Sequence, residues 1–514
     1  MTHTTIHSLF NEEIFSTKRC CGLLLHPTSL PGNYGLGDFG PYIFRFIDFL
    51  SKIGINLWQI LPLGPTGYGN SPYQLFSTYA GNPLLISPEK LQSLGLLELQ
   101  NPPRFSKSRI EYGKVIPYRW NLLKDAYETY CRNPYSLQSR FEAFKQTQSF
   151  WLEDYSLYMS IKEVFDYKPW NEWDEPLKFQ KKTKLKTWKH NYAKEIEFHN
   201  FVQFLFFFQW GAVKEYANQK NIMVVGDIPI FTAYDSAEVW AYPEFFSLDD
   251  QRELMYVAGV PPDYFSEIGQ RWGNPLYRND WGKKNGYHWW VQRIKHCFSL
   301  VNILRIDHFR GFESYWQIPA DEPTAIIGKW VVGPGIDLFI TLKEKLGQLP
   351  IIAENLGIIT SDVEELLKQT GFPGMRVLQF AFGNTKKSFV ENDYLPHNYV
   401  PNTVVYTGTH DNDTTASWFN TINEKTQNEV LEYLNSDGED VVGDLIRLCW
   451  SSVARFSIIP LQDLLRLGNE GRMNHPGTES GNWEWRFTWE QITEEKREEI
   501  IKLNRIYQRG NFEQ

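Results

Sequence analysis

The chain has 514 residues, of which 42% are hydrophobic and 22% are charged, a balance that is typical of a folded soluble protein. Its formal net charge of -9 argues against a nucleic-acid partner, because binding to phosphates needs a basic surface. Residues 1–15 lack the pattern of a signal peptide, and no apolar run reaches the length of a membrane span. The cysteines are sparse and odd in number, so we expect free thiols, a cytoplasmic protein and no membrane partner.

Short apolar runs recur along the chain, and each is followed by a polar turn that carries Gly or Pro. Near-continuous apolar and β-branched runs of this length are typical of strands that are buried on both faces, as in a parallel sheet. Eight runs of this kind begin at Cys21, Ile55, Ile222, Asn302, Pro350, Met375, Thr403 and Phe456.

Helical patterns lie between several of these runs. One predicted helix carries its apolar residues on a single face, and these are Ile43, Phe46, Ile47 and Leu50. Further along, Ser361 with Glu364 predicts a capping box at the start of another helix, whose apolar face is Val363, Leu366 and Leu367. Gly371 predicts the end of that helix.

Eight strands that alternate with helices predict an α/β fold, a (β/α)8 TIM barrel. The spacing is uneven, and structureless loops of such length are rare. We therefore expect one catalytic barrel domain over residues 1–514, with a mainly helical insertion at 85–220 between strands 2 and 3. A second insertion, or lid, is expected at 240–300 between strands 3 and 4. The chain ends soon after the eighth strand, so we expect no C-terminal β-domain.

Acidic residues follow four of the predicted strands, at the ends where a barrel carries its chemistry. They are Asp227, Asp307, Glu354 and Asp411. One such acid alone often only caps the next helix, but four together indicate a site. Cleavage of a glycosidic bond with retention needs two carboxyl groups about 5–5.5 Å apart, and neighbouring barrel strands can supply that separation.

The surroundings of two of these acids predict different protonation states. Arg305 lies two positions before Asp307 on the same face of its strand, so its charge is expected to lower the pKa of Asp307. Glu354 follows an apolar run without an adjacent cation, so burial is expected to raise its pKa. These expectations favour Asp307 as the nucleophile and Glu354 as the general acid/base.

Long specific strings extend over nearly the whole chain. They include LLLHPTSLPGNYGLGDFG, GYGNSPYQ, AGNPLLIS, GDIPI, PPDYFSEIGQRWGNPLYR, RIDHFRGF, AENLG, GTHDNDT and NHPGTESGNWEWR. In these strings the chain resembles the amylomaltase-type 4-α-glucanotransferases, glycoside hydrolase family 77 of the α-amylase clan.

The resemblance implies roles for individual residues. It implies that Asp307 is the nucleophile, Glu354 the general acid/base and Asp411 the residue that stabilises the transition state. It also implies a lid over the acceptor side at residues 261–278, which carries Tyr264 and Phe265. The residues that it implies for substrate binding are Ser71, Tyr73, Asp227, Gln270, Trp272, Arg305, His308 and His410.

The resemblance further implies α-1,4-glucans and maltooligosaccharides as substrates. We expect no cofactor and no metal, and a monomer or weak homo-oligomer. Transfer rather than hydrolysis rests mainly on the resemblance. An α-glucan hydrolase and a non-catalytic glucan-binding protein remain as alternatives.

Two other motifs have competing interpretations. His308 and His410 beside acids could indicate a metal site, but no His pair has helical spacing, so binding of sugar hydroxyls is preferred. Gly35, Gly37 and Gly40 match a dinucleotide motif, but intervening prolines make the turn too long, so these glycines are expected to shape a loop at the barrel mouth.

Overall fold

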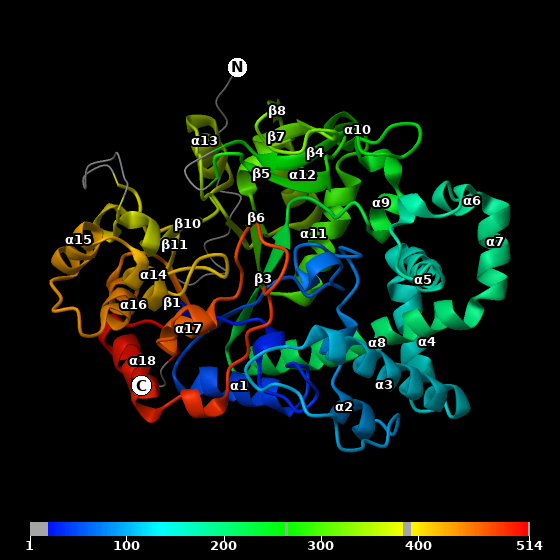
Figure 1. The fold of residues 1–514 in the computed structure, drawn as a ribbon, viewed down its shortest axis with the longest axis horizontal. Helices are drawn as coiled ribbons and strands as arrows, with labels where there is room; N and C mark the ends of the chain where they lie inside the picture. The colour runs from blue at the N-terminus through cyan, green and yellow to red at the C-terminus, as the bar shows by residue number, and fades with distance from the viewer. Residues whose placement is uncertain (1–18, 263–265, 384–391, 512–514) are drawn as a thin grey trace.

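The computed structural model describes residues 19–262, 266–383 and 392–511. Its centre is a closed barrel of eight parallel strands, which follow one another around the barrel in chain order (Figure 1). Each strand overlaps one of the eight predicted apolar runs, so the prediction of a (β/α)8 barrel is confirmed. The strands are β1 Cys20–Leu24, β2 Leu57–Gln59, β3 Met223–Pro229, β6 Ile303–Asp307, β9 Ile351–Ala353, β10 Gly374–Val377, β11 Thr403–Tyr406 and β12 Phe456–Pro460.

Helices cover the barrel from outside. The predicted apolar face of α1 is confirmed, because Ile43, Phe46, Ile47 and Leu50 are all fully buried. The helices outside the long insertion are α1 Pro41–Lys52, α9 Ala237–Ala241, α10 Asn279–Lys284, α11 His288–Leu300, α12 Gly335–Leu346, α13 Ser361–Thr370, α14 Thr415–Thr421, α15 Glu424–Leu434, α16 Val441–Ser451, α17 Leu461–Leu464 and α18 Glu494–Tyr507.

Helix α13 begins differently from the sequence prediction. Its N-cap residue is Thr360, whose backbone is extended, and no side chain caps the helix. Ser361 already lies in the first turn, so its hydroxyl is not placed to cap, and the predicted capping box is wrong. The predicted end is confirmed, because Gly371 adopts a left-handed backbone with φ 69°.

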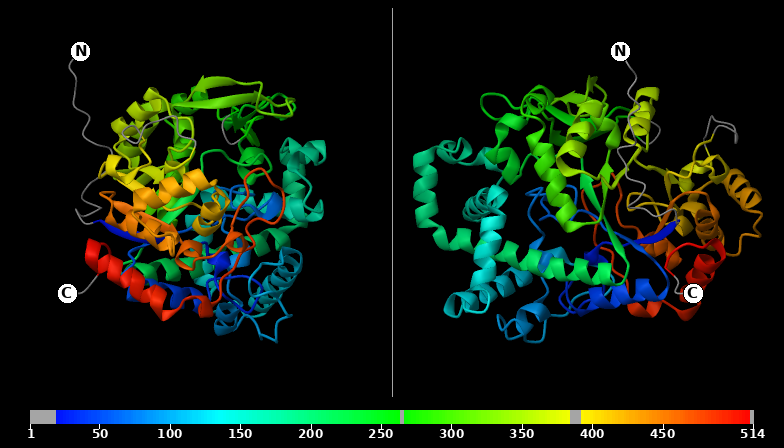
Figure 2. Two further views of the ribbon diagram at one scale, coloured as in Figure 1. Left: turned by 60° about the vertical axis from the view of Figure 1, so that its left-hand side comes forward. Right: turned by 180° about the vertical axis from the view of Figure 1, so that it is seen from behind.

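A bundle of helices projects from one side of the barrel between β2 and β3 (Figures 1 and 2). Its last helix, α8, leads directly into β3, and its rings pack against those of α3; Phe201 stacks on Tyr130 at 4.4 Å. An ion pair joins the bundle to the loop after β3, because the buried Lys162 ammonium lies 2.5 Å from the partly exposed Asp235. The bundle comprises α2 Pro88–Ser93, α3 Tyr112–Arg132, α4 Gln138–Thr147, α5 Ser149–Val164, α6 Glu175–Lys178, α7 Lys182–Asn191 and α8 Ala193–Gln219.

The sequence did not predict a second sheet, which lies above the barrel in Figure 1. It is antiparallel, with strand order β5-β4-β7-β8. Strand β5 occupies part of the segment 261–278 that the resemblance implies as a lid, so this part of the segment belongs to a sheet. The four strands are β4 Tyr256–Val260, β5 Gln270–Pro275, β7 Ser314–Pro319 and β8 Lys329–Val332.

All five cysteines are free thiols, and four of them are buried. Within the described ranges, the chain forms no helix that is long and apolar enough to cross a membrane.

Arg509 closes the end of the barrel opposite the predicted site. Its guanidinium is fully buried and donates hydrogen bonds to the carbonyl oxygens of Cys20, Trp450, Ser452 and Ala454 at 2.7–3.0 Å. These carbonyls belong to the start of β1, to the end of α16 and to the segment that enters β12, so one side chain joins the first and last barrel strands.

We predict that Arg509→Met lowers the free energy of unfolding by roughly 3 kcal/mol or more, because buried carbonyl groups lose their donors. Urea unfolding followed by circular dichroism measures this effect. The matched control is Arg505→Met, an exposed arginine on α18, which should change stability little. Equal effects of the two substitutions would contradict the role given to Arg509.

Candidate active site

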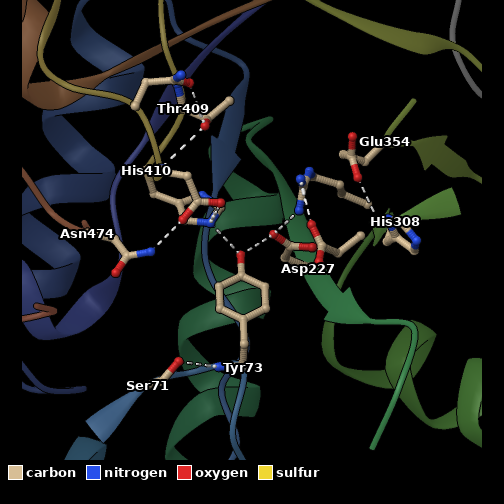
Figure 3. A network of polar contacts seen from close by, with 12 residues as sticks. Ser71, Tyr73, Asp227, His308, Glu354, Thr409, His410 and Asn474 are labelled. Carbon is tan, nitrogen blue, oxygen red and sulfur yellow. Dashed lines mark hydrogen bonds and ion pairs between the residues drawn. The ribbon is translucent and has the colours of Figure 1, made fainter. Parts of the chain in front are cut away.

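The four predicted acids meet at one rim of the barrel, where parallel strands end together. Asp307 is the last residue of β6, and Glu354 directly follows β9. The strand register pairs Ile306 with Ala353, so the next residues, Asp307 and Glu354, stand at matching positions of neighbouring strands. Figure 3 shows Asp227 and Glu354 near the same centre, with His410 opposite.

A buried arginine organises this centre. The Arg305 guanidinium lies 2.6 Å from Asp227 through Nη1 and 3.0 Å from Asp307 through Nη2, and its side chain is 4% exposed. Residues 305 and 307 project from the same face of β6, and Asp227 is the register partner of Arg305 on β3. Local strand geometry therefore places one cation between two carboxylates.

Backbone donors hold Glu354. Its two carboxyl oxygens accept the N–H groups of His308 at 2.7 Å and Leu356 at 2.5 Å. His308 has a left-handed backbone with φ 55°, which turns the chain directly after Asp307. The Glu354 side chain is thereby fixed beside the end of β6.

Burial raises the pKa of both carboxyl groups. For Asp307 it raises the pKa to about 7; Arg305 acts in the opposite direction, while Glu354, Asp227 and Asp411 add to the rise. For Glu354, burial also raises the pKa against the effect of Arg305 and the backbone donors. The expected rise for Glu354 is confirmed. The expected lowering for Asp307 is wrong, because burial and three other carboxylates outweigh one cation that Asp227 shares.

Asp411 has the opposite character. Asn474 donates to its Oδ1 at 2.6 Å, and His410 Nε2 lies 3.2 Å from its Oδ2. Burial raises the pKa of Asp411, but His410, Asn474 and Arg305 together lower it to about 2. Asp411 is therefore a stable carboxylate at neutral pH.

Tyr73 links the two sides of the site. Its hydroxyl donates to Asp227 at 2.7 Å and lies 2.8 Å from His410 Nε2 (Figure 3). Because a carboxylate only accepts hydrogen bonds, the single Tyr73 hydroxyl proton is donated to Asp227. His410 Nε2 must therefore be the donor in its contact with the Tyr73 oxygen. Ser71 lies further from the acids, and its hydroxyl accepts the Tyr73 N–H at 3.2 Å, which fixes the loop.

Several buried polar atoms around the acids have no hydrogen-bond partner within the described residues. They are Asp227 Oδ1, His308 Nε2, His410 Nδ1 and His26 Nδ1. Unpaired buried groups of this kind are costly, so they indicate ligand positions. His26, which follows β1, was missed in the sequence, although its position after a strand was a signal.

Trp272, one of the residues that the resemblance implies for substrate binding, lies beside His308. Its ring meets the His308 ring edge-on at 4.8 Å, and its Nε1 donates to Gln270 at 3.1 Å. The structure thus brings Gln270 and Trp272 of β5 to the acids. The other predicted lid residues, Tyr264 and Phe265, lie outside the described residues.

Two residues at the mouth come from the segment after β12 and were given no role in the sequence analysis. Asn474 orients Asp411, and the ring of Trp483 lies 5.9 Å from that of Tyr73 and 6.0 Å from that of His410. Both belong to the string NHPGTESGNWEWR, but no spacing signal connects them to residues more than 60 positions earlier.

A metal site was the alternative interpretation of these acids and histidines. Among the residues that the structure describes, no group of three or more His, Cys, Asp or Glu side chains is suited to hold a metal ion. The closed barrel, the acids at matching strand ends and the aromatic and unpaired polar groups define a carbohydrate-active (β/α)8 enzyme.

Comparison with known proteins agrees with this class. The model of glycoside hydrolase family 77, described as 4-alpha-glucanotransferase, matches residues 25–492. The 4-alpha-glucanotransferases of Thermus thermophilus and Synechocystis are each 48% identical, over 91% and 93% of this chain and 95% of their own. The amylomaltase of Streptococcus agalactiae, solved with acarbose, has a TM-score of 0.93 at 38% identity, with 96% of this chain and all of that chain covered.

The chain belongs to glycoside hydrolase family 77, and it is an enzyme with 4-α-glucanotransferase activity.

The pKa of Asp307 generates a stability prediction. Its pKa is about 7 in the folded chain and 3.8 ordinarily, so the folded state keeps a proton that the unfolded state has released between these values. Stability from this group is present below pH 4 and is lost as pH rises towards 7. Asp307→Asn removes this loss of stability. The melting temperature of the variant minus that of the native chain should therefore increase by a few degrees as the pH is raised from 5 to 8.

Differential scanning calorimetry of both chains across this range measures the difference. Asp321→Asn, at an exposed aspartate, serves as the control and should show no pH-dependent difference. A difference for Asp307→Asn that stays constant with pH would contradict the assigned shift.

Proposed function

We propose that the enzyme moves segments of α-1,4-glucans and maltooligosaccharides by a retaining double displacement, with Asp307 as nucleophile, Glu354 as general acid/base and Asp411 as stabiliser of the transition state. The observation that carries this proposal is the matching register of Asp307 and Glu354 on adjacent strands, at the rim that also holds Arg305 and Asp411.

In the first step, Asp307 attacks the anomeric carbon of the donor while Glu354 protonates the departing 4-oxygen. A glucosyl ester forms on Asp307, and the shortened glucan leaves with the proton of Glu354. The pKa values of both carboxyl groups are raised, so the two acids share a proton at neutral pH. The Arg305 cation, 3.0 Å from Asp307, favours the arrangement in which Asp307 carries the charge. The buried surroundings of Glu354 favour its protonated form.

In the second step, Glu354 removes the proton from an acceptor 4-hydroxyl, which attacks the ester and releases Asp307. The same carboxyl thus serves as acid and then as base. Asp411, held by Asn474 and His410, would receive hydroxyls of the distorted sugar and stabilise its developing positive charge.

The choice between transfer and hydrolysis depends on the acceptor. Water competes at high concentration, so an acceptor sugar must be held in a reactive position, and oriented binding can supply an effective molarity of roughly 10⁵ M or more. Trp272, Gln270 and the unpaired His308 Nε2 are the groups proposed to hold it.

The wider assignments belong to the same proposal. We take residues 1–514 as one catalytic domain with insertions at 85–220 and 240–300, the second of which covers the acceptor side. We further place the enzyme in the cytoplasm, as a monomer or weak homo-oligomer, and its free thiols are consistent with a reducing compartment.

Asp307→Asn and Glu354→Gln should each lower maltotriose disproportionation by about 10³-fold or more, because each removes a group that acts in both steps. A donor with a good leaving group separates the two roles. Fluoride leaves α-maltosyl fluoride without protonation, so Glu354→Gln should give a rapid burst of fluoride that is roughly stoichiometric with enzyme, and Asp307→Asn should give none.

A fluoride electrode in a rapid-mixing experiment records both outcomes. Glu322→Gln, a carboxyl-to-amide change in the loop that follows β7, is the matched control and should keep near-native rates. A fluoride burst from Asp307→Asn, or near-native disproportionation by either site variant, would refute the assigned roles.

The native enzyme should convert maltotriose alone into glucose and longer oligosaccharides with a constant number of reducing ends, because each transfer breaks one linkage and forms another. Chromatography by size combined with a reducing-sugar assay measures both quantities. A net gain of reducing ends would identify a hydrolase instead, and binding without turnover would identify a glucan-binding protein.

A further inference from the structure

A pocket with a volume of about 510 Å³ lies against the antiparallel sheet, and none of the four acids lines it. Its lining includes Ser247, Met255, Tyr277, Tyr315, Gln317 and Val332. None of these residues belongs to the proposed catalytic or substrate-binding set.

The strand pattern explains why these side chains gather. Tyr315 and Gln317 are two positions apart on β7, so both project from the same face of the sheet. Tyr315 is the register partner of Val331 on β8, which also lines the pocket. The intervening Trp316 lies on the other face, where its ring contacts Trp330 at 5.2 Å.

Three polar side chains in this pocket are neutral and available to a ligand. Arg278 is the one charged residue of the lining, and it already has an interaction of its own within the chain. The side chains of Ser247, Tyr315 and Gln317 have no hydrogen-bond partner among the residues that the structure describes. Each can both donate and accept a hydrogen bond, as sugar hydroxyls do. The described lining contains no carboxylate, so nothing in it calls for a cationic ligand.

Apolar surface lies beside these polar groups. Met255 is 47% exposed and Val332 is 76% exposed, a large fraction for residues of their kind. A pyranose ring combines an apolar C–H face with a rim of hydroxyls, and it matches this mixture of groups. We propose that the pocket binds one or two glucosyl units of an α-glucan, separately from the active site; the choice of glucose as the sugar rests on the proposed function.

Aromatic contacts connect this pocket to the acids. The rings of Tyr315 and Tyr277 lie 6.2 Å and 6.0 Å from that of Phe231. Phe231 lies 6.4 Å from Trp272, whose ring meets His308 at 4.8 Å. A series of ring contacts therefore runs from the pocket to His308, which directly follows Asp307 in the chain.

Calorimetric titration of maltose into the Glu354→Gln chain tests the proposal without depending on turnover. Tyr315→Phe with Gln317→Leu removes two of the polar groups and keeps the shape of the sheet. The matched control is Tyr135→Phe with Gln138→Leu, at two exposed positions on the helical bundle. In the Glu354→Gln chain, the pocket variant should bind one maltose fewer per chain than the control. When the same two pocket substitutions are made in a chain that keeps Glu354, kcat on maltotriose should change less than twofold.

Equal stoichiometry in the pocket variant and the control would overturn the proposal. Unchanged circular dichroism spectra and melting temperatures show that the variants are folded. Glucose release by the Glu354→Gln chain is followed in parallel; if it occurred, it would count against the role of Glu354, and the difference between pocket variant and control would still decide the pocket.

Discussion

The buried guanidinium of Arg305 is the interaction on which the site depends. A cation that is 4% exposed is stable in the folded chain only with paired charges, and its two partners are Asp227 on β3 and Asp307 on β6. The pairing fixes the orientation of the Asp307 carboxyl and joins two barrel strands at their chemical ends. Tyr73 extends the same network to His410 and from there to Asp411.

This arrangement separates the acids by environment. Asp411 has its own donors and is a carboxylate at neutral pH, whereas burial raises the pKa of both Asp307 and Glu354. A crowded pair of acids holds a proton more readily than either alone, and the pair titrates as a unit. The proposed chemistry uses that proton on Glu354, while Arg305 favours the charge on Asp307.

Much of this structure could be predicted from the sequence. Barrel strands are buried on both faces, so they appear as apolar runs, and the acids after them were found by position. The antiparallel sheet was missed because strands such as β5 mix polar residues, Gly and Pro. The contacts of Asn474 and Trp483, and the pKa of Asp307, depend on residues from other strands and distant loops, which local sequence does not reveal.

The central claim is that a sugar becomes covalently attached to Asp307. The most direct measurement is mass spectrometry of peptides from the Glu354→Gln chain after rapid acid quenching with α-maltosyl fluoride, since loss of the general base should slow breakdown of the ester. We predict a gain of one maltosyl group on the peptide that contains Asp307. An unmodified peptide under conditions where fluoride has been released, or a maltosyl group on another residue, would contradict the claim.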